Sequence, residues 1–184
     1  MRVVAGEAKG RRLISPPAAV TRAATERIRE SLFAIIEPVI GDSRVLDLFA
    51  GAGSLGIEAL SRGAARATFV ERDRTALAAI RANVAATGMG DRARVVAANV
   101  LAFLGGGTGG PFDLVFCDPP FSEVELLSAT LAHEGLRASL APDALVVARV
   151  LRKHRPTLPD GARIERDKPI GEETLLFLRY DAAR

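Results

Sequence analysis

A strand, a glycine-rich turn and a helix follow one another in the first half of the chain, and this unit constrains the fold more than any other feature. The apolar strand at 45–49 leads into a turn with the spacing G-x-G-x-x-G, formed by Gly51, Gly53 and Gly56, and a helix follows over about 54–62. Glu71 comes twenty residues after Gly51, at the end of the next strand. Such glycines permit a tight turn and close backbone approach to a ligand, and the acid can accept hydrogen bonds from ribose hydroxyls. The sequence therefore predicts an α/β domain with a nucleotide-type ligand at this turn.

Strands and helices alternate along the rest of the chain. Apolar runs predict strands near 45–49, 67–70, 94–97, 112–117, 144–150, 163–165 and 174–180, and helices near 21–37, 54–62, 74–87, 99–104 and 123–134. This alternation favours a mostly parallel sheet with helices on both faces. The last two strands have no helix of normal length between them, so we expect an antiparallel hairpin at one edge. Two short strands, 2–5 and 11–14, are expected to form an N-terminal hairpin around the turn 6–10.

The residues around the glycine turn favour S-adenosylmethionine over a nicotinamide dinucleotide, which would use the same glycine spacing. Asp47 lies near the carboxyl end of the first strand of the unit, where a carboxylate could attract a cationic amino acid group. Asn99, just past the third strand, has an amide suited to the N6 edge of adenine, although it could instead cap the helix that follows. The candidate cofactor-binding residues are Asp47, Phe49, Gly51, Gly53, Gly56, Glu71 and Asn99.

Asp118-Pro119-Pro120-Phe121 directly follows the apolar strand at 112–117 and forms a second candidate site. Two prolines cannot continue a central strand, because neither has an N–H group to donate. The segment therefore leaves the sheet at the edge where the glycine turn lies. An exocyclic amine on an aromatic base is a poor nucleophile, and the Asp118 carboxylate and Pro119 carbonyl could accept its two N–H groups and direct its lone pair at a methyl donor. Phe121 could stack on an unstacked base, so all four residues are candidate catalytic residues.

The other reactive side chains indicate no competing site. Cys117 lies within the strand before Asp118, where a cysteine usually behaves as a small hydrophobe rather than a nucleophile. One cysteine and two separated histidines, His133 and His154, predict neither a disulfide framework nor a metal cluster. No apolar run approaches the ~20 residues that span a bilayer, and the chain does not open with a signal-peptide pattern. We therefore expect a cytoplasmic protein without a membrane partner, and a monomer is the simplest state.

Positive charge is concentrated at the beginning of the chain. Residues 1–29 carry seven basic and two acidic groups, a net +5, whereas the whole chain carries +3. A basic segment on a near-neutral body is typical of nucleic-acid binders, although it could also be a solvated surface. The candidate RNA-binding residues are Arg2, Lys9, Arg11, Arg12, Arg22 and Arg27. Thr21, Arg22 and Thr25 could face either the cofactor or the RNA backbone.

Several longer stretches resemble the bacterial 16S rRNA guanine-N2 methyltransferases. They are the opening R-V-V-A-G-E-A-K-G-R-R-L at 2–13, T-R-A-A-T-E-R-I-R-E-S-L-F at 21–33, V-L-D-L-F-A-G-A-G-S-L-G-I-E-A-L-S-R-G-A at 45–64, F-V-E-R-D at 69–73, D-P-P-F at 118–121 and G-E-E-T-L at 171–175. Residue 23 is Ala where the family commonly has proline, and residue 121 is Phe where Tyr is more usual. A phenyl ring still stacks, so neither departure removes the expected chemistry.

The resemblance implies a class I S-adenosylmethionine-dependent methyltransferase fold, Rossmann-like and seven-stranded, at 21–184, with the basic hairpin at 1–20 as an extension. It implies methyl transfer to one guanine N2 of 16S rRNA, within assembled or partly assembled 30S subunits. The alternative hypotheses are an adenine-N6 methyltransferase acting on DNA, an NAD-dependent oxidoreductase, and a non-catalytic RNA-binding assembly factor. Sequence-specific DNA enzymes generally need an additional recognition region, for which 184 residues leave little room.

Overall fold

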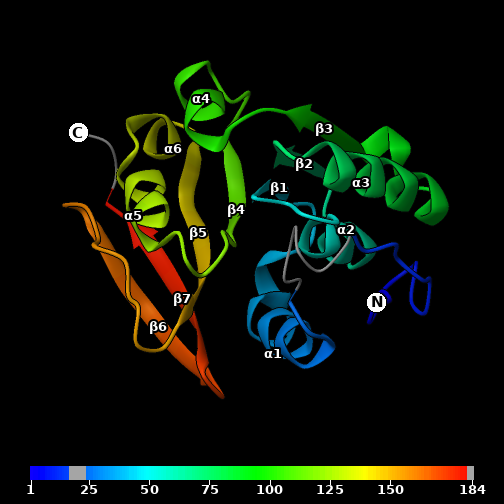
Figure 1. Cartoon of the computed structure of the whole chain (residues 1–184), viewed down its shortest axis with the longest axis horizontal. Coiled ribbons are helices and arrows are strands. Elements are labelled where there is room, and N and C mark those ends of the chain that lie inside the picture. Colours follow the sequence, from blue (N-terminus) through cyan, green and yellow to red (C-terminus); the bar gives the residue numbers. More distant parts are fainter. Residues whose placement is uncertain (17–23, 182–184) are drawn as a thin grey trace.

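The computed structural model describes residues 1–16 and 24–181, and a seven-stranded sheet forms its centre (Figure 1). The strand order is β3-β2-β1-β4-β5-β7-β6. The strands are β1 Arg44–Leu48, β2 Arg66–Glu71, β3 Ala93–Ala97, β4 Phe112–Cys117, β5 Leu140–Leu151, β6 Ala162–Ile170 and β7 Glu173–Tyr180.

Strands β1 to β5 run parallel, whereas β7 pairs antiparallel with both β5 and β6. The predicted mostly parallel sheet with an antiparallel edge hairpin is therefore confirmed, and so is the Rossmann-like fold. The chain extends the sheet from β1 to β2 and β3, then returns to the other side of β1 with β4. Ligands of open α/β sheets bind outside the carboxyl ends of the strands at such a reversal, so the fold places a site between β1 and β4.

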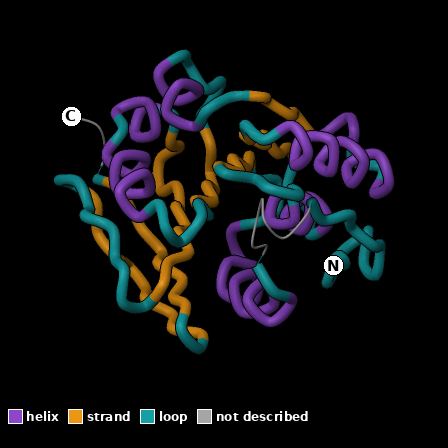
Figure 2. Tube along the Cα trace, viewed as in Figure 1, coloured by secondary structure: helices purple, strands orange, loops and turns teal. Residues whose placement is uncertain are grey.

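Helices cover both faces of the sheet and enclose two apolar clusters (Figures 1 and 2). Helices α1, α2 and α3 pack on one face, and α4, α5 and α6 on the other. Their bounds are α1 Glu26–Ile36, α2 Ser54–Ser61, α3 Arg74–Thr87, α4 Val100–Gly105, α5 Val124–Ala132 and α6 Glu134–Ala138, with 3₁₀ turns η1 Glu37–Val39 and η2 Gly90–Arg92.

Helix α1 carries the apolar face that its sequence predicts. Ile28, Leu32 and Ile36 are buried, and the ring of Phe33 meets the ring of Phe116 on β4 edge-on, with 5.9 Å between centroids. Thr25 caps the helix by accepting a hydrogen bond from the Ile28 N–H. The predicted start at residue 21 was therefore too early by five residues, and Thr21 and Arg22 lie outside the described part of the chain.

The N-terminal segment folds back on itself, as the predicted hairpin requires, and lies against α2: the Val3 N–H donates to the Arg11 carbonyl at 3.0 Å and the Leu13 N–H to the Met1 carbonyl at 2.9 Å. A single antiparallel bridge joins Arg2 to Arg12. The N–H groups of Val4 and Ala5 donate to the two carboxylate oxygens of Glu58, at 2.8 and 2.9 Å, rather than to a neighbouring strand. Glu58 is fully buried, and Arg62 also donates to it at 2.9 Å. The pairing of the two predicted strands is therefore confined to the neighbourhood of the Arg2 to Arg12 bridge, and Glu58 fastens the hairpin to α2.

The C-terminal half departs from the predicted boundaries in three places. Strand β5 begins at residue 140 instead of 144, and β6 covers Ala162–Ile170 instead of three residues. Proline at position 169 obscured the longer strand, but β6 lies at the edge of the sheet, where a missing N–H costs no ladder bond. The helix predicted at 123–134 is divided into α5 and α6, because His133 leaves the helical conformation and caps α6 through its Nδ1.

Candidate active site

The glycine turn is a strained connection between β1 and α2. Strand β1 ends at Leu48, and Phe49 follows with φ 62°, in the left-handed region that aromatic residues rarely adopt. Gly51 and Gly53 also have positive φ, 56° and 78°, which glycine adopts without a steric penalty. Backbone strain of this kind often marks ligand sites, and Phe49 itself lines the cavity described below.

Gly56 is required by close packing rather than by its dihedral angles. A Cβ atom at this position would lie 2.3 Å from Cε1 of Phe69 and 3.1 Å from Oδ2 of Asp47. Only glycine therefore lets α2 approach β1 and β2 this closely. The approach brings the Gly56 N–H within 2.9 Å of the Asp47 carboxylate.

Asp47 is buried on β1, with its side chain at the edge of the cavity. Burial raises the pKa of this carboxyl well above its usual value, and the hydrogen bond from Gly56 opposes part of that increase. Asp118 and Glu71 raise the pKa further through charge repulsion. A nearby cation would act in the opposite direction and favour the ionised form.

Glu71 is held at the end of β2 by three backbone donors. Its Oε2 accepts from the Gly51 N–H at 2.9 Å, and its Oε1 accepts from Arg72 and Asp73 at 2.7 and 2.8 Å. A carboxylate can accept about four hydrogen bonds, so capacity remains for a ligand. The acid that the sequence places twenty residues after Gly51 therefore contacts the glycine turn directly.

Asn99 caps helix α4, as the alternative interpretation of the sequence allowed. Its Oδ1 accepts from the N–H groups of Leu101 and Ala102, at 2.9 and 3.4 Å. The side chain also lines the cavity. Because the oxygen is engaged, any contact with an adenine would come from the side-chain N–H groups, which suit ring nitrogens rather than the N6 amine. The adenine contact stays a prediction.

The Asp118-Pro119-Pro120-Phe121 segment leaves β4 at the carboxyl edge, as predicted. Pro119 is buried, and no group in residues 1–16 or 24–181 donates a hydrogen bond to its carbonyl. The Pro120 carbonyl accepts from the Glu123 N–H at 2.8 Å, which fixes the exit of the chain. Phe121 is half-buried, and all four residues line the cavity.

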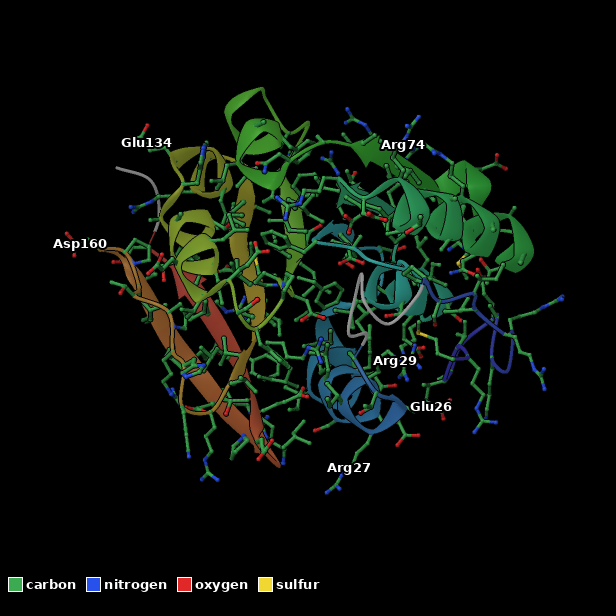
Figure 3. All side chains as sticks on the ribbon, viewed as in Figure 1. Glu26, Arg27, Arg29, Arg74, Glu134 and Asp160 are labelled. Atoms are coloured by element: carbon green, nitrogen blue, oxygen red, sulfur yellow. The ribbon has the colours of Figure 1, made fainter. Side chains whose placement is uncertain are left out.

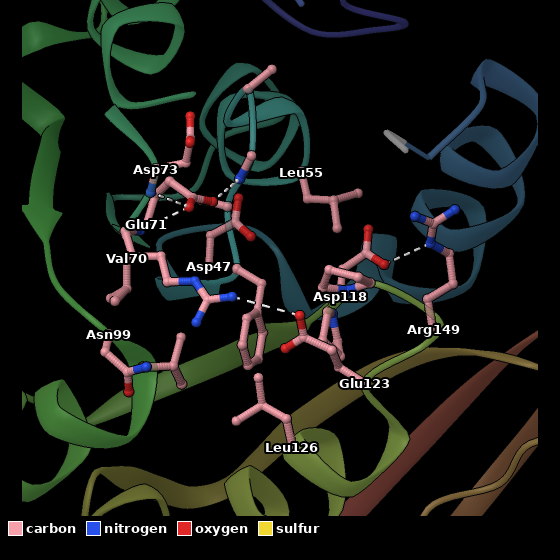
Figure 4. Close-up of a pocket in the computed structure, with 18 of the residues that line it drawn as sticks. Asp47, Leu55, Val70, Glu71, Asp73, Asn99, Asp118, Glu123, Leu126 and Arg149 are labelled. Atoms are coloured by element: carbon pink, nitrogen blue, oxygen red, sulfur yellow. Dashed lines mark hydrogen bonds and ion pairs between the residues drawn. The ribbon is translucent and has the colours of Figure 1, made fainter. Parts of the chain in front are cut away.

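The sequence analysis missed two charged residues near Asp118, Arg149 and Glu173, and Figure 4 shows the first of them paired with Asp118. Nε of Arg149 on β5 donates to Oδ1 of Asp118 at 2.7 Å, and Nη1 donates to Oε2 of Glu173 on β7 at 3.1 Å. The guanidinium also lies 4.9 Å from the centre of the Phe121 ring. An arginine inside an apolar strand run, at 144–151, was the signal that could have indicated Arg149, because unpaired arginine is seldom buried.

A single cavity of about 540 Å³ joins these elements. Its lining includes the glycine turn, Asp47, Glu71, Asn99 and the segment from Asp118 to Phe121. An ion pair of 3.6 Å between Arg72, after β2, and Glu123, before α5, spans its mouth, with side chains 63% and 33% exposed. The volume suits a small-molecule cofactor. The structure thus brings both sequence-predicted sites into one pocket at the reversal between β1 and β4.

The sequence matches the family described as Conserved hypothetical protein 95 over residues 1–179. The chain belongs to this family. It is 40% identical over 183 residues to the protein named Ribosomal RNA small subunit methyltransferase D from Escherichia coli K12, covering 99% of this chain and 91% of that protein. The Haemophilus influenzae protein of the same name is 34% identical over 174 residues, covering 93% and 89%.

Solved structures agree with the family assignment. The Escherichia coli protein yhhF superposes with a TM-score of 0.86 at 37% identity, covering all of this chain and 99% of that one. A hypothetical protein from Thermus thermophilus gives a TM-score of 0.79 at 32% identity, covering 96% and 98%. The family fold therefore extends over the whole chain.

Cys117 does not line the cavity. Cys117 is buried, and burial raises the pKa of its thiol far above the ordinary range, as expected of a core cysteine. Over residues 1–16 and 24–181 the structure contains no group of three or more His, Cys, Asp or Glu side chains arranged to hold a metal ion. In the same residues, no helix has the length and apolar character that crossing a bilayer requires.

The described candidate RNA-binding residues lie on the N-terminal segment and on α1, which contact each other through Arg2 and Glu26. Lys9, Arg11 and Arg12 are exposed on the N-terminal segment, and Arg27 points away from the body on α1 (Figure 3). Arg2 is partly neutralised by Glu26 at 3.2 Å. Arg22 lies outside the described residues. A second exposed basic run at 152–155, directly after β5, was not recognised in the sequence.

Arg29 shows that the charge of the N-terminal region is not all on the surface. Its side chain is fully buried on α1, and its Nη2 donates to the Arg2 carbonyl at 2.8 Å. Burial lowers the pKa of Arg29, while Glu58, Glu26 and Glu30 act in the opposite direction. Arg29 therefore serves to fix the N-terminal segment rather than to bind a polyanion.

Proposed function

We propose that this chain transfers a methyl group from S-adenosylmethionine to the exocyclic N2 of a guanine in 16S rRNA. The observation that carries the proposal is that Asp118 and Pro119 line the same cavity as the glycine turn and Glu71. One cavity thus offers a cofactor site and two acceptors for an amine. The names of the two relatives support small-subunit rRNA as the substrate. The choice of guanine N2 as the methylated atom rests on the family resemblance of the sequence.

The residues of the cavity fit S-adenosylmethionine in their chemistry. Glu71, fixed by three backbone N–H groups, is placed to accept hydrogen bonds from ribose hydroxyls. Asp47 is a buried carboxyl whose ionised form an approaching ammonium group would stabilise. The Asn99 side chain lines the same cavity. Because its Oδ1 is engaged by helix α4, its side-chain N–H groups are the ones that would contact a ring nitrogen of the adenine.

The catalytic corner would act mainly by positioning. When bound, the cofactor supplies an electrophilic methyl carbon on a positively charged sulfur. Asp118 and the Pro119 carbonyl accept the two N–H groups of the base amine, which localises its lone pair and stabilises the positive charge that develops on nitrogen. Phe121 stacks on the base, which must leave its helix or stack to enter the pocket. Pro120 keeps the segment rigid through its hydrogen bond with Glu123.

The same corner could serve the N6 amine of adenine, because both amines are exocyclic and conjugated to a ring. Adenine-N6 transfer is therefore the second candidate. Small-subunit rRNA in assembled or partly assembled 30S particles remains the favoured substrate, in the cytoplasm where ribosomes are built. The proposal treats the enzyme as a monomer, the simplest state.

Methyl transfer from labelled S-adenosylmethionine to 30S subunits that lack the modification tests the proposal directly. Free 16S rRNA and duplex DNA serve as parallel substrates, and mass spectrometry identifies the methylated nucleoside. We expect N2-methylguanosine in the 30S reaction. Label in adenine, or only in DNA, would overturn the substrate while keeping the chemistry of the corner. Cofactor binding without any transfer would favour a non-catalytic assembly factor.

The exposed N-terminal cations are expected to contribute to RNA binding through phosphate contacts. Each phosphate that is neutralised adds about 0.7 to 0.9 to the slope of log affinity against log salt concentration. Replacing Lys9, Arg11 and Arg12 together by alanine should therefore reduce that slope by about 2 to 3. The measurement is the equilibrium binding of a 16S rRNA fragment over a range of salt concentrations.

The control for this measurement is Arg163→Ala on the edge strand β6, whose side chain is 66% exposed and paired with Asp181. It removes one exposed positive charge far along the sheet from the N-terminal segment. We expect it to leave the slope unchanged. An unchanged slope in the triple variant as well would show that the N-terminal segment does not contact the RNA.

A further inference from the structure

The G-E-E-T-L segment at 171–175 has no role in the proposed chemistry as described so far, yet it supplies a partner for the catalytic corner. Glu173 begins β7, which pairs antiparallel with β5 through Arg149↔Leu175 and Leu151↔Glu173. This register brings the Glu173 carboxylate to the guanidinium of Arg149, at 3.1 Å. The side chain of Glu173 is 13% exposed and that of Arg149 is 6% exposed.

Arg149 joins three groups of the corner. It donates to Oδ1 of Asp118 from Nε and to Glu173 from Nη1, and its guanidinium lies over the Phe121 ring within the range of a cation–π contact. No described residue donates to Oδ2 of Asp118. The planar guanidinium therefore fixes the Asp118 carboxylate through one oxygen and leaves the other for a ligand.

The electrostatic surroundings of Asp118 give Arg149 a second effect. The charged and titratable groups that face Asp118 are Arg149 on β5, Glu173 on β7, and Asp47 on β1. Burial raises the pKa of Asp118, Arg149 lowers it, and Glu173 raises it. Arg149 is thus the cation that favours the ionised carboxylate in a site with two further acids.

We propose that Arg149, held in place by Glu173, is a positioning residue for methyl transfer: it orients the Asp118 carboxylate toward the amine, and it supports the Phe121 ring. This inference rests on the proposed function, since Asp118 and Phe121 are the groups that would contact the base. Arg149 lines the same cavity, and its hydrogen bond to Oδ1 of Asp118 is the contact through which it would act. A purely structural arginine would stabilise the sheet without affecting the acceptor.

The test compares Arg149→Met, Arg149→Lys and Glu173→Gln with the wild-type enzyme. Methionine removes the charge and the donors at similar length, lysine keeps the charge without the planar fork, and glutamine keeps an acceptor without charge. The control is Arg179→Met, which breaks the pair of Arg179 on β7 with Glu165, 2.6 Å apart, in another part of the same sheet. S-adenosylhomocysteine titration gives the concentration of competent enzyme for each variant.

In Arg149→Met, kcat for methyl transfer to 30S is expected to fall about 10- to 100-fold, the usual effect of losing an orienting partner. KM and the affinity for S-adenosylhomocysteine should change by less than about 3-fold, because Arg149 acts after binding. Activity requires ionised Asp118 and falls as pH drops through its pKa, so loss of the cation should move this acid limb to higher pH. Arg149→Lys should return the acid limb of the pH profile to its wild-type position but restore only part of kcat. Glu173→Gln should lower kcat by less than Arg149→Met does.

A readout independent of activity separates this inference from the proposed function. In ¹³C-labelled protein, the carboxyl resonance of Asp118, assigned by its absence in Asp118→Asn, should titrate at higher pH in Arg149→Met than in wild type. Unchanged titration, or a kcat within twofold of the wild type per competent enzyme, would overturn the positioning role. If Arg149→Met does not fold, the other two variants decide the question. A wild-type kcat per competent enzyme in Arg149→Lys would overturn the positioning role, and in Glu173→Gln Asp118 should titrate at lower pH than in wild type, because an acid that raises its pKa is removed. A wild-type enzyme that methylates nothing refutes the proposed function, and the titration still tests the Arg149 contact.

Discussion

The Asp118→Ala enzyme is expected to lose methyl transfer by about 10³-fold at saturating substrate, within the range that one catalytic polar group contributes. The carboxylate is one of two acceptors for the amine, and Pro119 cannot replace it. Cofactor binding should remain, because Asp47, Glu71 and the glycine turn contact one another without Asp118. The measurements are the single-turnover rate with 30S subunits and the affinity for S-adenosylhomocysteine by calorimetry.

Two further variants complete this experiment. Asp118→Asn keeps the shape and one acceptor oxygen, so it should retain more activity than the alanine variant. Asp91→Ala removes an exposed aspartate from the turn η2 and should leave the rate unchanged. An Asp118→Ala enzyme with the full rate would show that the proposed catalytic corner is wrong, whatever its melting temperature.

The Gly56→Ala protein is expected to be less stable and to bind the cofactor more weakly. Its new methyl group would lie 2.3 and 2.8 Å from two atoms of the Phe69 ring, which is fully buried and has no solvent to move into. Overpacking of this kind costs about 1–3 kcal/mol, and each 1 kcal/mol lowers the melting temperature of a domain of this size by about 2–4 °C. Any displacement of α2 would also disturb the Gly56 to Asp47 hydrogen bond at the cavity.

A matched control for this change lies in helix α4. Gly105 is its last residue, and a Cβ there would meet no atom within 4 Å. Gly105→Ala should therefore be neutral or slightly stabilising, since alanine favours the helix by up to about 1 kcal/mol. Thermal unfolding with and without S-adenosylhomocysteine measures both effects. Equal melting temperatures and affinities for the two variants would refute the close-packing argument for Gly56.

The cofactor side of the site could be predicted from the sequence because its contacts are short in the chain and regular in pattern. Gly51, Glu71 and Asp47 belong to one strand-turn-helix-strand unit, and parallel pairing of β1 with β2 brings the two carboxylates and the Gly51 backbone to the same edge. The position of Asp118 follows from the same rule, because β4 pairs with β1 in parallel. The seven-stranded sheet and its edge hairpin follow from the order of strands and helices.

The contacts of Arg149 could not be predicted in this way. The contact between Arg149 and Asp118 depends on the parallel register of β4 and β5, in which Cys117 pairs with Ala148. The contact between Arg149 and Glu173 depends on the separate antiparallel register of β5 and β7. A one-residue shift in either pairing would turn these side chains to opposite faces. The attachment of the N-terminal hairpin could not be predicted either. Its two arms pair near Arg2 and Arg12 as expected, but the hydrogen bonds from Val4 and Ala5 to Glu58 on α2 join residues more than fifty positions apart.

Glu58 determines how shortened forms of this enzyme should be made and interpreted. Its carboxylate has no exposure to solvent, and two of its hydrogen bonds come from the backbone of Val4 and Ala5. A chain that starts at residue 21 would remove both backbone donors from this buried acid and leave Arg62 as its described side-chain donor, so we expect damage to α2 and the turn that precedes it. Weaker RNA binding by such a truncation would therefore report unfolding as much as lost phosphate contacts. Charge-removing point substitutions in a protein that retains residues 1–20 avoid this confusion.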